Sequence, residues 1–261
     1  MARLDSELVT RGIARSRQRA KEMIASRSVT VNGVTAKKAS SEVCPEDVLE
    51  SSEQELYVGR GALKIEKAAG EFGIDFSGKV CMDIGASTGG FTDYMLSRGA
   101  ARVFAVDVGH GQLAEKLRSD ERVENMEGTD IRTVSKEDIG TAIDIISVDV
   151  SFISLKLILP KVYELLSDDG EAAVLIKPQF EAGRSDIGKN GIVKDRKVHL
   201  RVLREIDEFA CSAGFMCEKY TFSPVKGGSG NTEYLVHLRR CGSVRKVHDF
   251  KGLVEKAFEI L

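Results

Sequence analysis

The sequence predicts an α/β protein in which a doubly wound, mostly parallel sheet of seven strands follows a small N-terminal α+β domain. Three observations lead to this prediction. From residue 79 onward, short runs rich in β-branched residues alternate with helical stretches, and 42% of the 261 residues are hydrophobic, as a packed core requires. Basic residues gather in the first 40 positions. The predicted boundaries are 1–55 for the N-terminal domain, 56–60 for a linker and 61–261 for the larger domain.

The N-terminal domain is predicted to be a helix–helix–hairpin unit. Apolar residues recur at near-helical spacing between residues 3 and 24, and Gly12 interrupts them, so two short helices are expected. Asn32-Gly33 is a strong two-residue hairpin signal between alternating segments. The predicted strands are 29–31, 34–38 and a further short strand near 48–49.

The charge of this domain is uneven. The whole chain has a formal charge of -2, but residues 1–40 hold nine Arg or Lys against three acids, and residues 41–56 hold six acids and no base. A basic cluster of this kind is typical of contact with nucleic-acid phosphates, although an ordinary solvated helix face is the alternative. Because Trp is absent and neither domain offers an obvious aromatic platform, structured RNA is expected rather than extended single strands. The candidate RNA-binding residues are Arg3, Arg11, Arg15, Arg17, Arg19, Lys21 and Arg27.

The cysteines and the N-terminus bear on the cellular compartment. Five cysteines without a C-x-x-C pair argue against a disulfide framework or a zinc site, so reduced thiols and no bound metal are expected. The first ten residues, MARLDSELVT, are interrupted by charged and polar side chains where a signal peptide would place an apolar stretch, and no run approaches the roughly 18 apolar residues of a membrane span. The expectation is a soluble cytoplasmic protein.

The larger domain is predicted to contain five parallel strands followed by a hairpin. The last two strands are separated by a turn too short for a crossover helix, so they should pair antiparallel at one end of the sheet. An amphipathic helix is expected over 247–261. The predicted strands are 79–84, 102–107, 122–126, 143–148, 171–176, 215–221 and 232–238.

A glycine-rich turn follows the first of these strands and leads into a helix near Phe91. Glycines at such a turn let a ligand approach the backbone at a helix N-terminus, although tight strand-to-helix packing is the alternative. The spacing matches neither dinucleotide-binding enzymes nor P-loop proteins. Asp83, two residues before the first glycine, suits a ligand with a positively charged amino-acid end.

Two further acids complete the predicted cofactor site. Asp107 ends the second strand, where a carboxylate can accept hydrogen bonds from ribose hydroxyls. Asp130 follows the third strand and could receive an adenine amino group or cap a helix. The candidate cofactor-binding residues are Asp83, Gly85, Ala86, Ser87, Thr88, Gly89, Gly90, Phe91, Asp107 and Asp130.

Charged residues follow the fourth and fifth strands at the edge where ligands bind in open α/β sheets. Asp149 ends one strand and Lys177 the next, and Pro178 favours an extended conformation at Lys177. Glu233 lies near the start of the final antiparallel strand, which begins at the same edge. Lys64 belongs to a helix that precedes the first strand. A snorkelling strand-end lysine at 177 and an exposed lysine at 64 are the alternatives.

Several segments together resemble the TlyA family of ribosomal RNA 2'-O-methyltransferases, often labelled haemolysin A. They are DIGASTGGFTD, AVDVGHGQL, DVSFISL, IKPQFEAGR and SPVKGGSGNTEYL. The first segment of about 33 residues is similar to the RNA-binding domain of a small-subunit ribosomal protein. The larger domain resembles the FtsJ-like ribose methyltransferases, whose Lys-Asp-Lys-Glu tetrad falls on Lys64, Asp149, Lys177 and Glu233.

The resemblance implies S-adenosylmethionine as the methyl donor and a ribose 2'-hydroxyl, of cytidine, in ribosomal RNA or ribosomal subunits as the substrate. The absence of an apolar spanning segment leads us to expect no membrane partner, and no obligate protein partner is evident from the sequence. Lys177 could accept the proton of the hydroxyl or, as a cation, orient it. The competing functions are a non-enzymatic RNA-binding or ribosome-assembly factor, a haemolysin-like membrane-active protein and, more distantly, a dinucleotide oxidoreductase.

Overall fold

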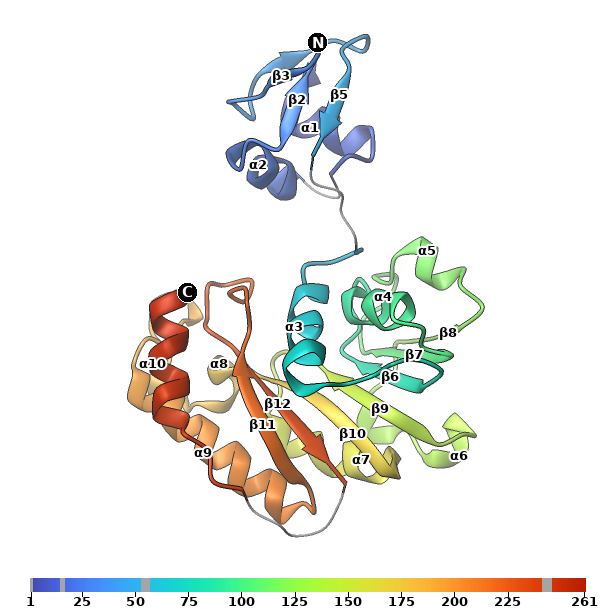
Figure 1. Ribbon diagram of the computed structural model, residues 1–261, viewed down its shortest axis with the longest axis vertical. Coiled ribbons are helices and arrows are strands. Elements are labelled where there is room, and N and C mark those ends of the chain that lie inside the picture. The colour runs from blue at the N-terminus through green and yellow to red at the C-terminus, as the bar shows by residue number, and fades with distance from the viewer. Residues whose placement is uncertain (1, 15–16, 53–56, 241–245) are drawn as a thin grey trace. The chain divides into compact units, whose positions relative to one another are not determined.

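The computed structural model describes residues 2–14, 17–52, 57–240 and 246–261. The chain forms two compact units, Met1–Val58 and Gly59–Leu261 (Figure 1). Arg15, one of the candidate RNA-binding residues, lies outside the described residues. The predicted linker 56–60 includes Leu56, which also lies outside them, so the domain boundaries 1–55 and 61–261 stay predictions.

The N-terminal unit contains the two predicted helices and the predicted hairpin. Asn32 and Gly33 have φ angles of 52° and 77°, as the tight turn between the hairpin strands requires. A short antiparallel pair between β1 (Ala2–Arg3) and β4 (Glu42–Val43) was not predicted. The elements are β1 Ala2–Arg3, α1 Leu4–Thr10, α2 Arg17–Ala25, β2 Val29–Val31, β3 Val34–Thr35, β4 Glu42–Val43 and β5 Leu49–Ser51, with sheet order β3-β2-β5.

Arg11 connects two parts of the N-terminal unit instead of facing solvent. Its Nε donates to Glu7 Oε1 at 2.8 Å, and its terminal nitrogens donate to the carbonyl oxygens of Asp47, Cys44 and Pro45 at 2.5 to 3.0 Å. These contacts use the guanidinium donors inside the unit. Arg11 thus holds the 44–47 turn against α1, and its contact with RNA phosphate stays a prediction.

The other candidate RNA-binding side chains differ in their exposure to solvent. Arg3 and Arg17 both bind the buried carboxylate of Asp5, and the hydrogen bonds from Arg3 lower the pKa of Asp5 to about 2. Half of the side chain of Arg3 and of Arg17 is nevertheless exposed. Lys21 and Arg27 are exposed, while Arg19 is part-buried and pairs with Glu22.

The second unit is built on a seven-stranded sheet of order β11-β12-β10-β9-β6-β7-β8, in which β12 alone among the seven runs antiparallel to both of its neighbours (Figure 1). This confirms the predicted parallel sheet and the antiparallel hairpin at its end. The strands are β6 Val80–Ile84, β7 Arg102–Asp107, β8 Val123–Glu127, β9 Ile143–Val148, β10 Leu166–Ile176, β11 Met216–Phe222 and β12 Tyr234–Arg239.

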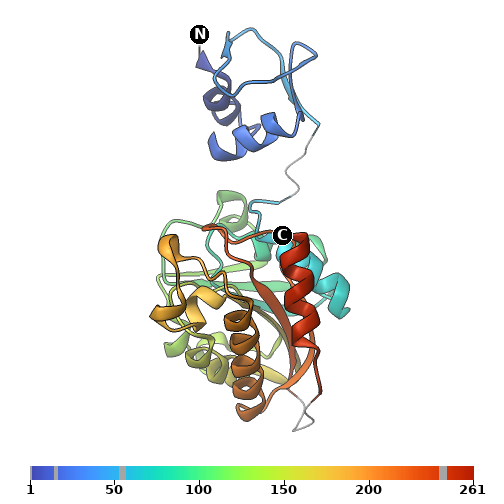
Figure 2. The same cartoon turned by 90° about the vertical axis from the view of Figure 1, so that its left-hand side faces the viewer.

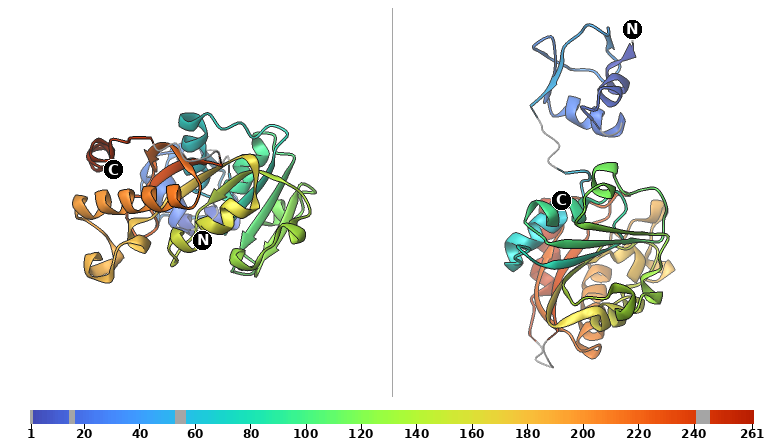
Figure 3. Two further views of the ribbon diagram at one scale, coloured as in Figure 1. Left: turned by 90° about the horizontal axis from the view of Figure 1, so that it is seen from below. Right: turned by 90° about the vertical axis from the view of Figure 1, so that its right-hand side faces the viewer.

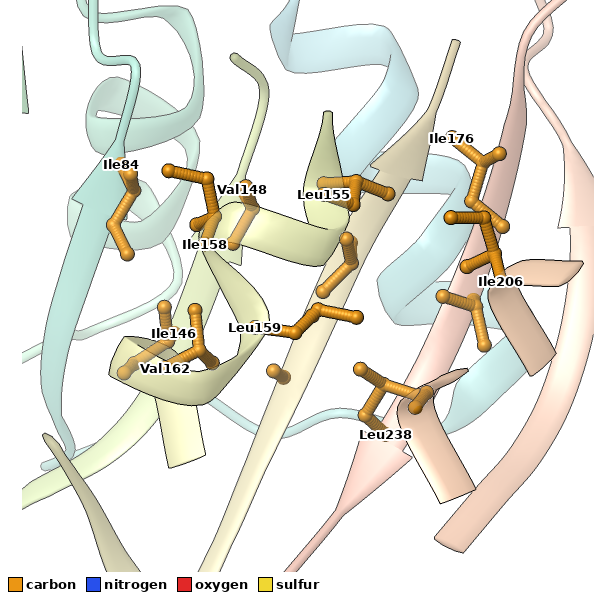
Figure 4. Close-up of a cluster of buried hydrophobic side chains, with 14 of the residues drawn as sticks. Ile84, Ile146, Val148, Leu155, Ile158, Leu159, Val162, Ile176, Ile206 and Leu238 are labelled. Carbon is orange, nitrogen blue, oxygen red and sulfur yellow. The ribbon is translucent and has the colours of Figure 1, made fainter. Parts of the chain in front are cut away.

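Helices cover both faces of this sheet (Figure 3). α7 and α9 pack on one face, where they share a hydrophobic cluster with β6, β9, β10 and β12 (Figure 4). α3 and α4 pack on the other face, and the closing helix α10 lies beside α9 (Figure 2). The α-helices are α3 Ala62–Phe72, α4 Gly90–Ser97, α5 Glu115–Arg118, α6 Lys136–Ile139, α7 Leu159–Leu165, α8 Pro178–Glu181, α9 Arg196–Ser212 and α10 Phe250–Ile260, and the 3-10 turns are η1 Ile131–Thr133, η2 Leu155–Leu157, η3 Arg184–Asp186 and η4 Lys189–Gly191.

Within the described ranges, no helix combines the length and the apolar character that crossing a bilayer requires.

Replacing Arg11 with Ala should destabilise the N-terminal unit by about 1.5 to 3 kcal/mol, because several hydrogen bonds from a charged donor to part-buried or exposed backbone carbonyls are lost. Replacing the exposed Lys21 with Ala should change stability by about 0.5 kcal/mol or less. Amide hydrogen exchange of α1 and β5 in the intact chain measures both effects. Equal protection in the two variants would contradict the structural role of Arg11.

Candidate active site

Strand alternation brings three charged residues to one face of the sheet. Ile176 of β10 lies opposite Tyr234 of β12, so the next residues, Lys177 and Glu233, come together beyond the end of the ladder. Val148 ends β9 beside β10, and Asp149 follows it. Successive side chains on a strand point to opposite faces. Because Val148, Ile176 and Tyr234 belong to the cluster under α7 and α9, the charged residues face α3.

α3 contributes the fourth charged residue, Lys64, from its first turn. Lys64 Nζ lies 2.8 Å from Glu233 Oε2 and 3.3 Å from Asp149 Oδ2, and Lys177 Nζ lies 2.5 Å from Asp149 Oδ1. The four charges form an alternating chain, Glu233–Lys64–Asp149–Lys177, called the tetrad below. The structure therefore brings all four predicted catalytic residues together.

The tetrad is nearly dry. The exposed fraction is 9% for Lys64, 8% for Lys177 and 2% for Glu233. Burial by itself would lower the pKa of Lys64, but the charges of Asp149 and Glu233 outweigh burial and raise it. Lys64 is therefore held as a cation between two carboxylates, and the alternative of an exposed lysine is wrong.

Two polar side chains that the sequence analysis did not assign support the tetrad. Lys177 Nζ donates a hydrogen bond to Ser151 Oγ at 2.9 Å. Gln179 Nε2 donates to Glu233 Oε1 at 3.3 Å. Both lie in segments that carried the family resemblance, DVSFISL and IKPQFEAGR, but their contacts depend on side-chain directions that a sequence pattern does not specify.

Backbone approaches the tetrad closely at two glycines. At Gly227, a Cβ atom would overlap the carboxylate of Glu233. Gly85 has a φ of 85°, and a Cβ there would lie 2.5 Å from the carbonyl oxygen of Asp149. The glycine-rich turn after β6 therefore packs directly against the end of β9.

A cavity of about 440 Å³ opens at the carboxyl ends of β6, β7 and β9. Gly85, Ser87, Asp107 and Asp130 line it, as does Asp149 of the tetrad. Asp107 accepts hydrogen bonds from the backbone N–H groups of Ser87 at 2.8 Å and Gly109 at 2.7 Å, so it also fixes the glycine-rich turn. A second cavity of about 200 Å³ adjoins the same turn and is lined by Lys64, Asp83, Ala86, Thr88, Gly90, Phe91 and neighbouring residues.

Three predicted cofactor residues have internal roles. Asp130 accepts from the backbone of Arg132 at the start of η1 and forms an ion pair with its guanidinium, so the structure shows the cap that the sequence left open. Gly89 lines neither cavity and packs against Leu117. Asp83 is 1% exposed, and its carboxylate is enclosed between α4 and the sheet.

The Asp83 carboxylate ties α4 to the sheet. One oxygen accepts from the backbone N–H and the hydroxyl of Thr92 at 3.0 and 2.8 Å, and the other accepts from Ser147 Oγ at 2.9 Å. Burial outweighs these hydrogen bonds and raises the pKa of Asp83 to about 6. Its contact with a cofactor ammonium stays a prediction.

An aromatic pair stands beside the first cavity. Phe152 lines the cavity, is 91% exposed and has a φ of 64°, which is unusual for a bulky residue. Its ring lies 4.9 Å from that of Phe180, which in turn lies 5.8 Å from Lys177 Nζ. The sequence pattern did not identify this aromatic pair, and whether it stacks on a base stays a prediction.

The sheet order, the antiparallel β12 and the crevice at the carboxyl strand ends define a Rossmann-like methyltransferase. Residues 57–240 match the FtsJ-like methyltransferase family, and residues 2–49 match the S4 domain. The chain belongs to the TlyA family of FtsJ-like methyltransferases with an N-terminal S4 domain.

Relatives cover nearly the whole chain. The "Putative rRNA methyltransferase YqxC" of Bacillus subtilis is 46% identical over 90% of this chain and 85% of its own length. The "16S/23S rRNA (cytidine-2'-O)-methyltransferase TlyA" of Mycobacterium tuberculosis is 42% identical over 91% of this chain and 90% of its own. A solved structure described as a "Putative hemolysin from Streptococcus thermophilus" superimposes with a TM-score of 0.80 at 40% identity, covering 99% of this chain and 96% of that one.

Replacing Asp83 with Asn should alter the pH dependence of folding. Because its folded pKa of about 6 lies above the ordinary aspartate value of 3.8, the stability that Asp83 contributes is present below about pH 4 and is lost as pH rises through 6. Asn is neutral throughout, so the stability of the variant relative to wild type should rise by up to about 3 kcal/mol from pH 4 to pH 7. Urea unfolding at several pH values measures this difference, and a constant difference would rule out the raised pKa.

Proposed function

We propose that this protein transfers the methyl group of S-adenosylmethionine to a ribose 2'-hydroxyl, of cytidine, in ribosomal RNA. The observation that carries the proposal is the buried tetrad beside a cavity at the carboxyl ends of the strands. The relative named as a cytidine-2'-O-methyltransferase supports the choice of ribose and base. The intact ribosomal subunit as substrate and a cytoplasmic location are parts of the same proposal.

The two cavities suit S-adenosylmethionine. A volume of about 440 Å³ falls within the usual range of small-molecule sites. In this arrangement, Asp107 and Asp130 would hold the adenosine part, and the smaller cavity beside Asp83 and Thr88 would hold the amino-acid end. The close approach of Gly85 to Asp149 would bring the ligand next to the tetrad. When bound, S-adenosylmethionine would supply a reactive methyl group on a sulfonium.

The protein would chiefly orient the hydroxyl and handle its proton. Lys177 is the residue assigned to contact the 2'-hydroxyl: as a neutral amine it would accept the proton, and as a cation it would orient the oxygen lone pair. Asp149 holds the Lys177 amine by their 2.5 Å contact. Lys64 and Glu233 complete the set so that two positive and two negative charges balance in a site with little water.

RNA would be held by both units. The exposed Lys21 and Arg27 of the S4 domain would contact phosphates. The exposed ring of Phe152, beside the cavity, would stack on a base of the target strand. A non-enzymatic RNA-binding factor would have no need of a complete charged tetrad, and the tetrad likewise gives no support to a membrane-active or oxidoreductase function.

Replacing Lys177 with Ala should lower methyl transfer by about 10² to 10⁴, the usual effect of removing a positioned acid or base. Lys177→Arg should fail almost as badly, because a guanidinium does not give up its proton and has a wider shape than an ammonium. Single-turnover transfer of labelled methyl groups to unmodified ribosomal subunits, followed by mapping of the modified ribose, measures the effect.

Binding separates loss of chemistry from loss of structure in these variants. Calorimetry should give wild-type affinity for S-adenosylmethionine in Lys177→Ala but weaker affinity in Asp107→Ala, whose carboxylate lines the cavity. Wild-type methylation by either Lys177 variant would remove the tetrad from the mechanism. Unchanged binding by Asp107→Ala would remove the cofactor assignment.

Replacing both Lys21 and Arg27 with Ala should weaken RNA binding and reduce its salt dependence. Each lost phosphate contact removes about 0.7 to 0.9 from the slope of log affinity against log salt concentration. Filter binding of ribosomal RNA at several salt concentrations measures the slope. A slope equal to that of wild type would show that these two side chains belong to a solvated surface.

A further inference from the structure

The amine of Lys177 makes two contacts that differ in kind. Its nitrogen lies 2.5 Å from Asp149 Oδ1, but that oxygen, although buried, has no partner with hydrogen-bond geometry among the described residues. The contact is therefore an ion pair that places the charge. The contact with Ser151 Oγ at 2.9 Å does have hydrogen-bond geometry.

This difference decides which neighbour controls the direction of the amine. An ion pair attracts the amine from many angles, because a charge–charge interaction depends mainly on distance. A hydrogen bond fixes an N–H direction, because it weakens steeply as the angle departs from linear. The hydrogen bond to Ser151 thus selects the rotation about the Cε–Nζ bond of Lys177. Once that rotation is selected, the directions of the other substituents on the tetrahedral nitrogen follow.

Ser151 is well placed for such a role. It lies two residues after Asp149, in the short segment between β9 and η2, and it is exposed and lines the larger cavity. Its neighbour Phe152 turns the chain with a φ of 64°. Because the Ser151 oxygen accepts from Lys177, its own O–H is left to donate elsewhere.

We infer that Ser151 is a positioning residue for methyl transfer: its hydroxyl sets the orientation of the Lys177 amine, so that a remaining amine position faces the 2'-hydroxyl. The inference rests on the proposed function, because it concerns the same site and the same reacting group. The role belongs to the hydroxyl of Ser151, acting through Lys177, and not to the volume of the side chain.

Matched variants test the hydroxyl directly. Ser151→Ala should slow single-turnover methyl transfer by about 10- to 100-fold, the equivalent of one hydrogen bond to a charged group. Ser151→Thr, which keeps a hydroxyl, should recover to within about 3-fold of wild type, whereas Ser151→Val, which has nearly the shape of Thr without the hydroxyl, should not. The KM for RNA should stay within about 3-fold in all three variants. Because Ser151 lines the proposed cofactor cavity, calorimetry sets the S-adenosylmethionine concentration so that all rates are compared at saturating cofactor.

A double-mutant cycle tests whether Ser151 acts through Lys177. In the Lys177→Ala background, Ser151→Ala should have no further effect, because the group that it positions is gone. Ser154→Ala is the control for the local chain, since its hydroxyl binds Glu181 and not Lys177. Ser154→Ala should lower thermal stability and leave the single-turnover rate within about 3-fold of wild type.

The outcomes distinguish this inference from the proposed function. If the unaltered protein methylates RNA and Ser151→Ala does so at the same rate, the inference is overturned and the proposed function stands. Equal rates for Ser151→Thr and Ser151→Val would also overturn it, because the hydroxyl would then be irrelevant. If the unaltered protein transfers no methyl group to ribosomal RNA, the proposed function fails and takes the inference with it.

Discussion

The balance of two lysines and two carboxylates in a nearly dry site is the constraint on which the rest of the catalytic unit depends. A buried charge without a partner costs several kcal/mol, so each member of the tetrad requires the others to be in place. Lys64 meets both carboxylates, and therefore α3 must lie across the ends of β9 and β12. The antiparallel direction of β12 follows the same need, since it brings Glu233 to the edge where the parallel strands end.

The carboxylates of the unit divide into two kinds according to their surroundings. Asp83 lies among neutral hydroxyl and backbone donors, and burial raises its pKa toward neutrality. Asp149 lies two residues beyond Ser147 on the same face, and two ammonium groups compensate it. The first acid ties α4 to the sheet, and the second faces the larger cavity. Two aspartates at neighbouring strand ends thus have different roles, because one is surrounded by neutral donors and the other by two ammonium groups.

The sequence predicted the order of elements and the meeting of the tetrad because both follow from local periodicity and from the rule that strand ends share an edge. It placed the start of β10 at residue 171 rather than Leu166, because the polar residues between them do not alternate and the ladder shifts register there. Arg11 was assigned to RNA from its charge. Its hydrogen bonds to the 44–47 turn could not be predicted, because they depend on where that turn lies in the folded unit. Ser151 and Phe152 were not predicted for a related reason. The contact of Ser151 depends on side-chain rotamers and the position of Phe152 on a positive φ, and neither produces a periodic pattern in the sequence.

The bond between Lys64 and Glu233 joins residues 169 positions apart. The protein is synthesised from its N-terminus, so the S4 unit is complete after Val58, long before the residue that closes the charged network has been added. A nascent or truncated chain that ends before β12 would therefore carry an RNA-binding surface without a working reaction centre.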